Sequence, residues 1–459
     1  MNTQKFEILP VLHRADFSND FRWGCSTSSY QVEGAIHEGG RGESIWDRFS
    51  ADPKNIRDAS TGAVACDHYH RWPEDLDSIR DLGLNAYRFS IAWPRIFPNG
   101  RGTPNQEGLD FYSRLVDGML ERGLEPWATL YHWDLPQALQ DEGGWTNRET
   151  IAAFNEFANV VTRHLGDRIK HWITHNEPWC TAFHGNFEGN HAPGIKDWKT
   201  ALQVCHNVLV SHGQAIPIIR ANVPEAKVGI ALSLHPIKPA SDSAADVAAA
   251  QRHDGIRNRW FLDPLFGRGY PADVLELCGT NAPTIHAGDL AAIATATDFL
   301  GVNYYFPEII ADAPGDGQIG VAVVAPDNVE RTAFGWEVSP EGLVTLLSRV
   351  FADYAPANIY ITENGSSYDD FVAADGSVND PERQAYLIRH LAATKQAIAQ
   401  GIPVKGYFAW SLLDNFEWAE GYIRRFGLTY IDFATQERTL KTSGKWFGNF
   451  LKHEEIVPN

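Results

Sequence analysis

Eight short segments rich in β-branched and aromatic residues recur along the chain, each followed by a longer stretch whose apolar residues have helical spacing. The segments span residues 21–27, 86–92, 125–132, 170–176, 227–234, 298–304, 358–363 and 404–410. Consecutive segments begin between 39 residues (86 to 125) and 71 residues (227 to 298) apart, which leaves room for a crossover helix. This alternation predicts an α/β fold, a (β/α)8 barrel with elaborated βα loops. A doubly wound sheet stays open as an alternative, because periodicity does not reveal closure.

Capping residues and prolines mark where several helices are expected to begin. Thr146 and Glu149 are predicted to form a capping box before a helix that ends at Gly166. Two further helices are predicted to begin with a proline directly after a capping side chain, at Ser339 with Pro340 and at Asp380 with Pro381. The stretch 312–328 is poor in apolar residues and predicts a long surface loop. No linker-like segment divides the chain, so residues 1–459 are predicted to form a single domain.

The charge balance narrows the range of partners. Lys and Arg number 39 and Asp and Glu 58, so the net charge is 39 − 58 = −19, which repels polyphosphates and anionic membranes. We therefore expect neither nucleic acid nor a membrane as a partner, and the oligomeric state is left open, a homo-oligomer included. The sequence has no apolar stretch of about 20 residues, and its first 20 residues lack the layout of a signal peptide. A cytoplasmic protein is expected.

Two glutamates stand at the predicted carboxyl ends of strands, where barrels of this kind carry their reacting groups. Glu177 lies in THNEPW after the fourth segment, and Glu363 lies in YITENG at the end of the seventh. Paired carboxylates can act as a neutral proton donor and an ionised nucleophile or base. Other strand ends carry amide, His and Trp side chains, and 12% of the residues are aromatic, which suits stacking on sugar rings. The sequence therefore predicts a glycoside as the substrate.

Eight ordered motifs run along nearly the whole chain. They are FRWGCSTSSYQVEGA, YRFSIAWPRI, TLYHWDLPQ, THNEPW, LGVNYY, YITENG, YFAWSLLDNFEW and RFGLTYID. In these motifs the sequence resembles glycoside hydrolase family 1, the β-glucosidase family. The resemblance implies a retaining double displacement on a (β/α)8 barrel, with neither a cofactor nor a metal. It also implies that Glu177 is the general acid/base and Glu363 the nucleophile.

The resemblance assigns roles to the residues around these two carboxylates. Arg88, Asn303 and Tyr305 match positions that orient or tune the nucleophile, and Asn303 and Tyr305 are also assigned to substrate binding. The other implied substrate-binding residues are Gln31, His132, Trp133, Asn176, Trp336, Trp410, Glu417, Trp418 and Phe426. Among them, Trp410 is the expected stacking floor for the terminal sugar, and Trp336 is the expected platform for the leaving group.

The expected activity is that of an exo-acting retaining β-glucosidase on short cello-oligosaccharides and on aryl or alkyl β-glucosides. A β-galactosidase, β-fucosidase or mannosidase preference stays open, as does the preferred aglycone. A phospho-β-glycosidase is disfavoured, because Glu417 would repel a phosphate at the 6-position. A thioglucosidase is disfavoured by the glutamate at position 177.

Two alternatives from other classes are a catalytically inactive sugar-binding barrel and a metal-dependent barrel hydrolase. The first is expected to have lost a carboxylate, and both are present in this sequence. For the second, Asp67, His68 and His70 in DHYH suggest a metal cluster. They precede a helical pattern and do not end a strand, so we expect them to be structural.

Overall fold

The computed structural model describes residues 9–452, and its centre is a closed barrel of eight parallel strands in the order β1-β11-β10-β7-β5-β4-β3-β2. The strands are β1 (Arg22–Ser26), β2 (Ala86–Ser90), β3 (Glu125–Tyr131), β4 (His171–Asn176), β5 (Lys227–Ser233), β7 (Phe299–Asn303), β10 (Ile359–Asn364) and β11 (Val404–Trp410). Strand β1 pairs with both β2 and β11, which closes the barrel. Seven of the predicted segments contain a whole strand, and segment 358–363 contains all of β10 except Asn364. The barrel is therefore confirmed and the doubly wound sheet is excluded.

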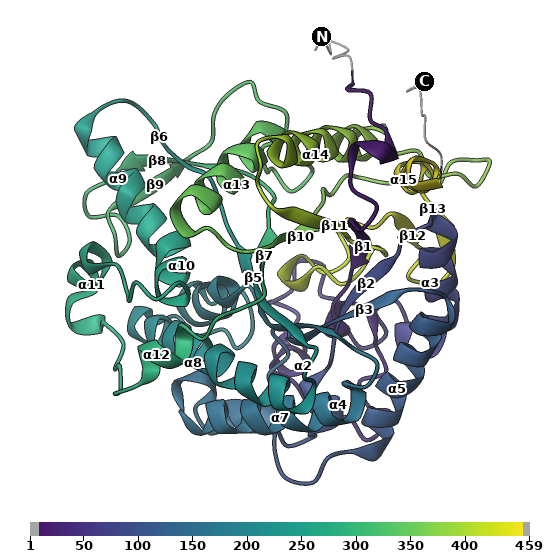
Figure 1. Ribbon diagram of the computed structural model, residues 1–459, viewed down its shortest axis with the longest axis horizontal. Coiled ribbons are helices and arrows are strands. Elements are labelled where there is room, and N and C mark those ends of the chain that lie inside the picture. The colour runs from purple at the N-terminus through teal and green to yellow at the C-terminus, as the bar shows by residue number, and fades with distance from the viewer. Residues whose placement is uncertain (1–8, 453–459) are drawn as a thin grey trace.

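Helices surround the strands, as Figure 1 shows, with α3, α5, α7, α8, α13 and α14 on the outside of the barrel. The longer helices are α3 (His68–Leu82), α5 (Gln106–Glu121), α7 (Glu149–Leu165), α8 (Trp198–Asn222), α9 (Ala244–Asp254), α13 (Pro340–Tyr354), α14 (Pro381–Ala399) and α15 (Thr442–Lys452). The shorter ones are α1 (Ser29–Val32), α2 (Ile45–Ser50), α4 (Trp93–Ile96), α6 (Gln137–Asp141), α10 (Trp260–Leu265), α11 (Ala272–Cys278) and α12 (Asp289–Ile293).

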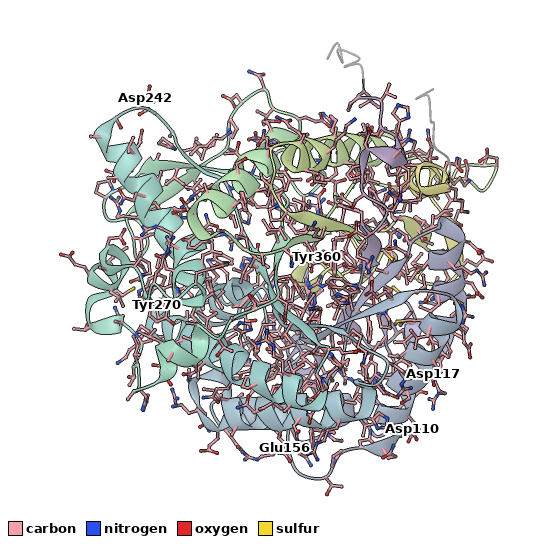
Figure 2. The ribbon with its side chains drawn as sticks, viewed as in Figure 1. Asp110, Asp117, Glu156, Asp242, Tyr270 and Tyr360 are labelled. Carbon is pink, nitrogen blue, oxygen red and sulfur yellow. The ribbon has the colours of Figure 1, made fainter. Side chains whose placement is uncertain are left out.

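Apolar side chains fill the interior of the barrel near the amino-terminal ends of its strands. The ring centroid of Trp127 lies 5.1 Å from that of Phe408 and 4.6 Å from that of Tyr360, which is labelled near the middle of Figure 2. Gly24 belongs to this packing, because a Cβ atom there would lie 2.2 Å from the Phe408 ring. The filled interior leaves the carboxyl ends of the strands as the place for a cavity.

The predicted capping box is wrong, although the helix predicted to follow it is present as α7. Thr146 lies in a 3-10 turn, Gly144–Thr146, and its hydroxyl donates to the carbonyl of Gly143. Helix α7 begins at Glu149, whose backbone N–H donates to the side-chain oxygen of Asn147 at 3.0 Å. The capping function therefore falls to an asparagine one residue later than predicted.

Helices α13 and α14 begin at Pro340 and Pro381, as predicted, but neither preceding side chain caps its helix. The hydroxyl of Ser339 donates to Glu341 instead. The carboxylate of Asp380 accepts from the backbone N–H of Ser443 at 2.8 Å, a contact with helix α15. Tertiary contacts have replaced the local caps that the sequence pattern indicated.

The stretch 312–328 is more than the predicted loop. Strand β9 (Val321–Val324) lies within it, pairs antiparallel with β8 (Glu308–Asp312), and forms a three-stranded sheet with β6 (Ile237–Pro239). Four apolar residues flanked by glycine and polar turns are too few to give a clear strand pattern. A second small sheet pairs β12 (Thr429–Ile431) with β13 (Arg438–Leu440).

Candidate active site

A cavity of about 300 Å³ lies among the loops that follow the barrel strands. Ten of the residues that the sequence singled out line it, namely His132, Trp133, Glu177, Tyr305, Trp336, Glu363, Trp410, Glu417, Trp418 and Phe426. Four others, Gln31, Arg88, Asn176 and Asn303, are buried and form hydrogen bonds with residues of this cavity. The structure therefore brings the whole predicted set together.

Glu363 is the last residue but one of β10 and is 3% exposed. Arg88 on β2 donates to its Oε1 at 2.5 Å, and the hydroxyl of Tyr305 donates to its Oε2 at 2.7 Å. Removal from water, the largest effect, and the charge of Glu177 raise the pKa of Glu363 to about 7, against the lowering effect of Arg88 and Tyr305. The two hydrogen bonds hold both carboxyl oxygens in fixed positions.

Glu177 follows the end of β4, and its side chain is held by neutral donors. The amide of Asn303 donates to its Oε1 at 2.9 Å, and the thiol of Cys180 donates to its Oε2 at 3.0 Å. Its backbone φ is 47°, in the left-handed region that is uncommon for residues other than glycine. Its backbone N–H donates to the carbonyl of Ala231 on β5, which fixes this turn against the barrel.

The amide of Asn176 links the two carboxylates through buried hydrogen bonds. Its Oδ1 accepts from Arg88 at 2.6 Å and from Asn303 at 3.0 Å. Its Nδ2 lies 3.1 Å from Nε2 of His132. Burial, and then the charge of Arg88, lower the pKa of His132 well below its usual range. This imidazole is therefore neutral, and its Nε2 accepts a hydrogen bond from the amide of Asn176.

Glu417 lies on the loop after β11, on the wall of the cavity. The amide of Gln31 donates to its Oε2 at 3.5 Å and to Oδ1 of Asn415 at 2.9 Å. Removal from water, followed by the charges of Glu363 and Glu177, raises the pKa of Glu417 to about 8. A carboxyl group in this state can accept or donate hydrogen bonds to a polar ligand.

Aromatic rings form much of the remaining wall. The ring of Trp410 lies 5.8 Å from that of His132, and Trp418 lies 4.7 Å from Trp133. Trp336 stacks on Phe334 at 4.3 Å and lies 5.2 Å from Tyr305, and Phe426 is 5.8 Å from Trp336. Such flat apolar faces next to hydrogen-bonding groups suit sugar rings and aromatic groups.

Several residues of the cavity were not predicted, among them Cys180, His184, His191, Ser233, His235, Arg257, Phe306, Phe334 and Glu420. One signal was available for Ser233, because it ends β5, the strand for which no site residue had been proposed. Another was available for Cys180, which lies three residues after Glu177 at the start of a helical turn. Arg257 and Phe334 come from long loop insertions, whose course the sequence pattern does not reveal.

The DHYH residues lie at the start of α3, outside the cavity. His68 is buried and its Nδ1 lies 2.8 Å from Asp75, and His70 contacts Asp67 and Glu38. Across residues 9–452, no group of three or more His, Cys, Asp or Glu is placed to hold a metal ion. Within the same range, no helix is long and apolar enough to cross a membrane.

Comparisons with known proteins agree with this geometry. A family model described as glycosyl hydrolase family 1 matches residues 13–456. Beta-glucosidase A of Thermotoga maritima is 46% identical over 441 residues, which cover 96% of this chain and 98% of that protein. The 1,4-beta-D-glucan glucohydrolase of Thermotoga neapolitana is 45% identical over 442 residues, covering 96% of this chain and 99% of that protein.

Solved structures agree equally well. The family 1 β-glucosidase of Thermotoga maritima in complex with glucoimidazole superposes with a TM-score of 0.93 at 45% identity. The superposition covers 96% of this chain and 99% of that chain. The resemblance seen in the motifs is thus confirmed over almost the full length, and the chain belongs to glycosyl hydrolase family 1.

Proposed function

We propose that the protein is a retaining β-glucosidase that removes the terminal non-reducing glucosyl residue of a β-glucoside. The observation that carries this proposal is the placement of Glu177 and Glu363 on one cavity with different partners. The names of the relatives, a β-glucosidase and a glucan glucohydrolase, support a β-linked glucoside and short cello-oligosaccharides as substrates. Residues 1–459 are proposed to form a single glycoside hydrolase domain.

Glu363 is assigned as the nucleophile, because Arg88 and Tyr305 each donate to one of its oxygens and favour its ionised form. Glu177 is assigned as the general acid/base, because its partners are the neutral amide of Asn303 and the thiol of Cys180. When Glu177 is neutral, its charge no longer adds to the effect of burial on the pKa of Glu363, and the contacts with Arg88 and Tyr305 favour the ionised Glu363.

The reaction then proceeds in two displacements. Glu363 attacks the anomeric carbon while Glu177 gives its proton to the glycosidic oxygen, and the aglycone leaves as an alcohol. Glu177 next takes a proton from water, whose oxygen attacks the anomeric carbon and releases Glu363. This mechanism requires the two carboxyl groups to lie about 5 to 5.5 Å apart. The product keeps the β configuration.

The terminal sugar is assigned to the part of the cavity with Gln31, His132, Asn176, Glu417 and Trp418, with Trp410 as its floor. Glu417 and Gln31 are hydrogen-bonded to each other and both can bond sugar hydroxyls. Trp336 is assigned to the leaving group. The cavity of about 300 Å³ is of a size that encloses one sugar and part of its aglycone.

A panel of 4-nitrophenyl β-glycosides tests this function. We expect the β-glucoside to give the highest kcat/KM, with the galactoside, fucoside and mannoside lower. A higher kcat/KM for the galactoside or the fucoside would show that the protein is a β-galactosidase or a β-fucosidase instead. The absence of hydrolysis with every member of the panel would favour the inactive sugar-binding barrel.

A further inference from the structure

Arg257 forms part of the wall of the catalytic cavity, and the mechanism above gives it no role. It lies in the segment Gly255–Arg259 directly after helix α9 and is 5% exposed. Ser233 and His235, from the end of β5 and the next loop, line the cavity with it. Among residues 9–452, it is the only lysine or arginine on this wall.

A continuous set of ring contacts joins Arg257 to the residues assigned to the leaving group. Arg257 contacts Nε2 of His235, and the ring of His235 lies 4.6 Å from that of Phe306. Phe306 in turn stacks on Trp336, with centroids 4.9 Å apart and planes at 28°. The guanidinium therefore belongs to the leaving-group wall, which we define as Ser233, His235, Arg257, Phe306 and Trp336.

The guanidinium has donors that the protein does not use. Its Nη2 donates to the hydroxyl of Ser233 at 3.1 Å and to His235. Its Nε and Nη1 are buried without a hydrogen-bond partner among the described residues. Glu308 comes within 3.9 Å of Nε, which is beyond hydrogen-bond distance. Because unpaired buried donors destabilise a fold, they indicate a site that a ligand completes.

The charge of Arg257 is partly compensated by Glu308, whose carboxylate lies 3.9 Å from its Nε. Burial, and then the charge of Arg257, lower the pKa of His235 to about 3, so His235 is neutral and accepts from the guanidinium. Glu308 is ionised, and its carboxylate is also hydrogen-bonded to His253 at 2.8 Å. The ring of Trp179 covers the guanidinium, with its centroid 3.8 Å from Cζ. A cation shielded from water in this way interacts strongly with an anion.

We propose that Arg257 selects β-glucosides whose aglycone is an aromatic acid, by pairing with the carboxylate while Trp336 and Phe306 contact the ring. The planar guanidinium matches a carboxylate, and the two neighbouring rings match an aryl group. Both unused nitrogens are buried, so the pairing includes a rotation of the guanidinium toward the cavity. The inference rests on the proposed β-glucosidase function and specifies its substrate class.

The test compares two substrates that differ in one charge, the β-glucosides of 4-hydroxybenzoate and 4-hydroxybenzamide. The ratio of their kcat/KM values is measured in the wild type, in Arg257→Met and in Lys238→Met, a matched loss of charge at an exposed residue. The difference in leaving-group ability cancels when ratios are compared. We expect Arg257→Met to lower the acid-to-amide ratio at least about tenfold, and Lys238→Met to leave it within about twofold. An unchanged ratio in Arg257→Met would overturn the proposal.

Binding to the unaltered protein provides a measurement that needs neither turnover nor a variant. Calorimetric titration should give tighter binding of benzoate than of benzamide, and added salt should reduce the difference. Equal affinities would contradict the role of Arg257 even if the variant fails to fold. If neutral aryl glucosides are hydrolysed but benzoate and benzamide bind with equal affinity, only this inference is refuted. If no glycoside is hydrolysed, the proposed function itself is refuted.

Discussion

Arg88 and Glu363 form an ion pair of 2.5 Å inside the barrel, with the arginine on β2 and the glutamate at the end of β10. Both side chains are almost completely buried. A second nitrogen of Arg88 donates to Asn176 at 2.6 Å, so one guanidinium orients groups from two other strands. This arrangement explains how residues 275 positions apart in the sequence are held in a fixed geometry.

Arg88→Met should raise the pKa of Glu363 further above its value of about 7, because the cation that stabilises the carboxylate is removed. A nucleophile must be ionised, so the acidic limb of the pH profile of kcat/KM should move to higher pH. We also expect kcat/KM at neutral pH to fall at least about a hundredfold. Circular dichroism checks folding, and an unshifted acidic limb in a folded variant would show that Arg88 does not act on Glu363.

Glu363→Ala and Glu177→Ala should affect substrates in different ways. Without Glu363, no glycosyl-enzyme forms, so the variant should lose its activity on every β-glucoside. Without Glu177, substrates with excellent leaving groups, which need no proton, should be spared far more than those with poor ones. Rates with 2,4-dinitrophenyl and phenyl β-glucosides measure this difference. Equal losses for the two substrates in Glu177→Ala would mean that the roles are assigned wrongly.

Glu417→Ala should lower kcat/KM on β-glucosides at least about a hundredfold. The sugar hydroxyls lose a buried hydrogen-bond partner, and the lost hydrogen bonds are stronger in the transition state than in the bound substrate. Glucosides should lose more than xylosides, which lack the 6-hydroxyl. A change below about threefold would make Glu417 an ordinary loop residue. An equal loss of kcat/KM on glucosides and xylosides would show that Glu417 binds the sugar but does not contact the 6-hydroxyl.

The raised pKa of Glu417 also implies that the free energy of unfolding depends on pH. Its pKa is about 8 in the folded protein and about 4.3 in an unfolded chain, so the folded state binds more protons between these values. The free energy of unfolding should therefore fall as the pH rises from about 4.3 to 8. Relative to Glu417→Gln, the wild-type Tm should drop by at least about 2 °C between pH 5 and pH 9. Glu437→Gln, at an exposed residue, serves as the control and should follow the wild type.

The sequence predicted the barrel because each strand is a short apolar segment followed by a helix, a local pattern. Closure became visible only in the pairing of β1 with β11, which are 382 residues apart (22 to 404). Residues within motifs, such as Glu177 and Glu363, could be placed at strand ends. Arg257 could not, because its position depends on how a long insertion folds back over the cavity. The predicted cap at Asp380 failed for a similar reason, since its partner Ser443 is distant in the sequence.

Trapping of the glycosyl-enzyme tests the central claim most directly. The protein is incubated with 2,4-dinitrophenyl 2-deoxy-2-fluoro-β-D-glucoside. Its fluorine slows both displacements, and its good leaving group restores the rate of the first, so the glycosyl-enzyme accumulates. Mass spectrometry of the intact protein and of its peptides should find one fluoroglucosyl group, attached to Glu363, with activity lost in parallel. A label on another residue, or release of dinitrophenol with no gain in protein mass, would contradict a double displacement through Glu363.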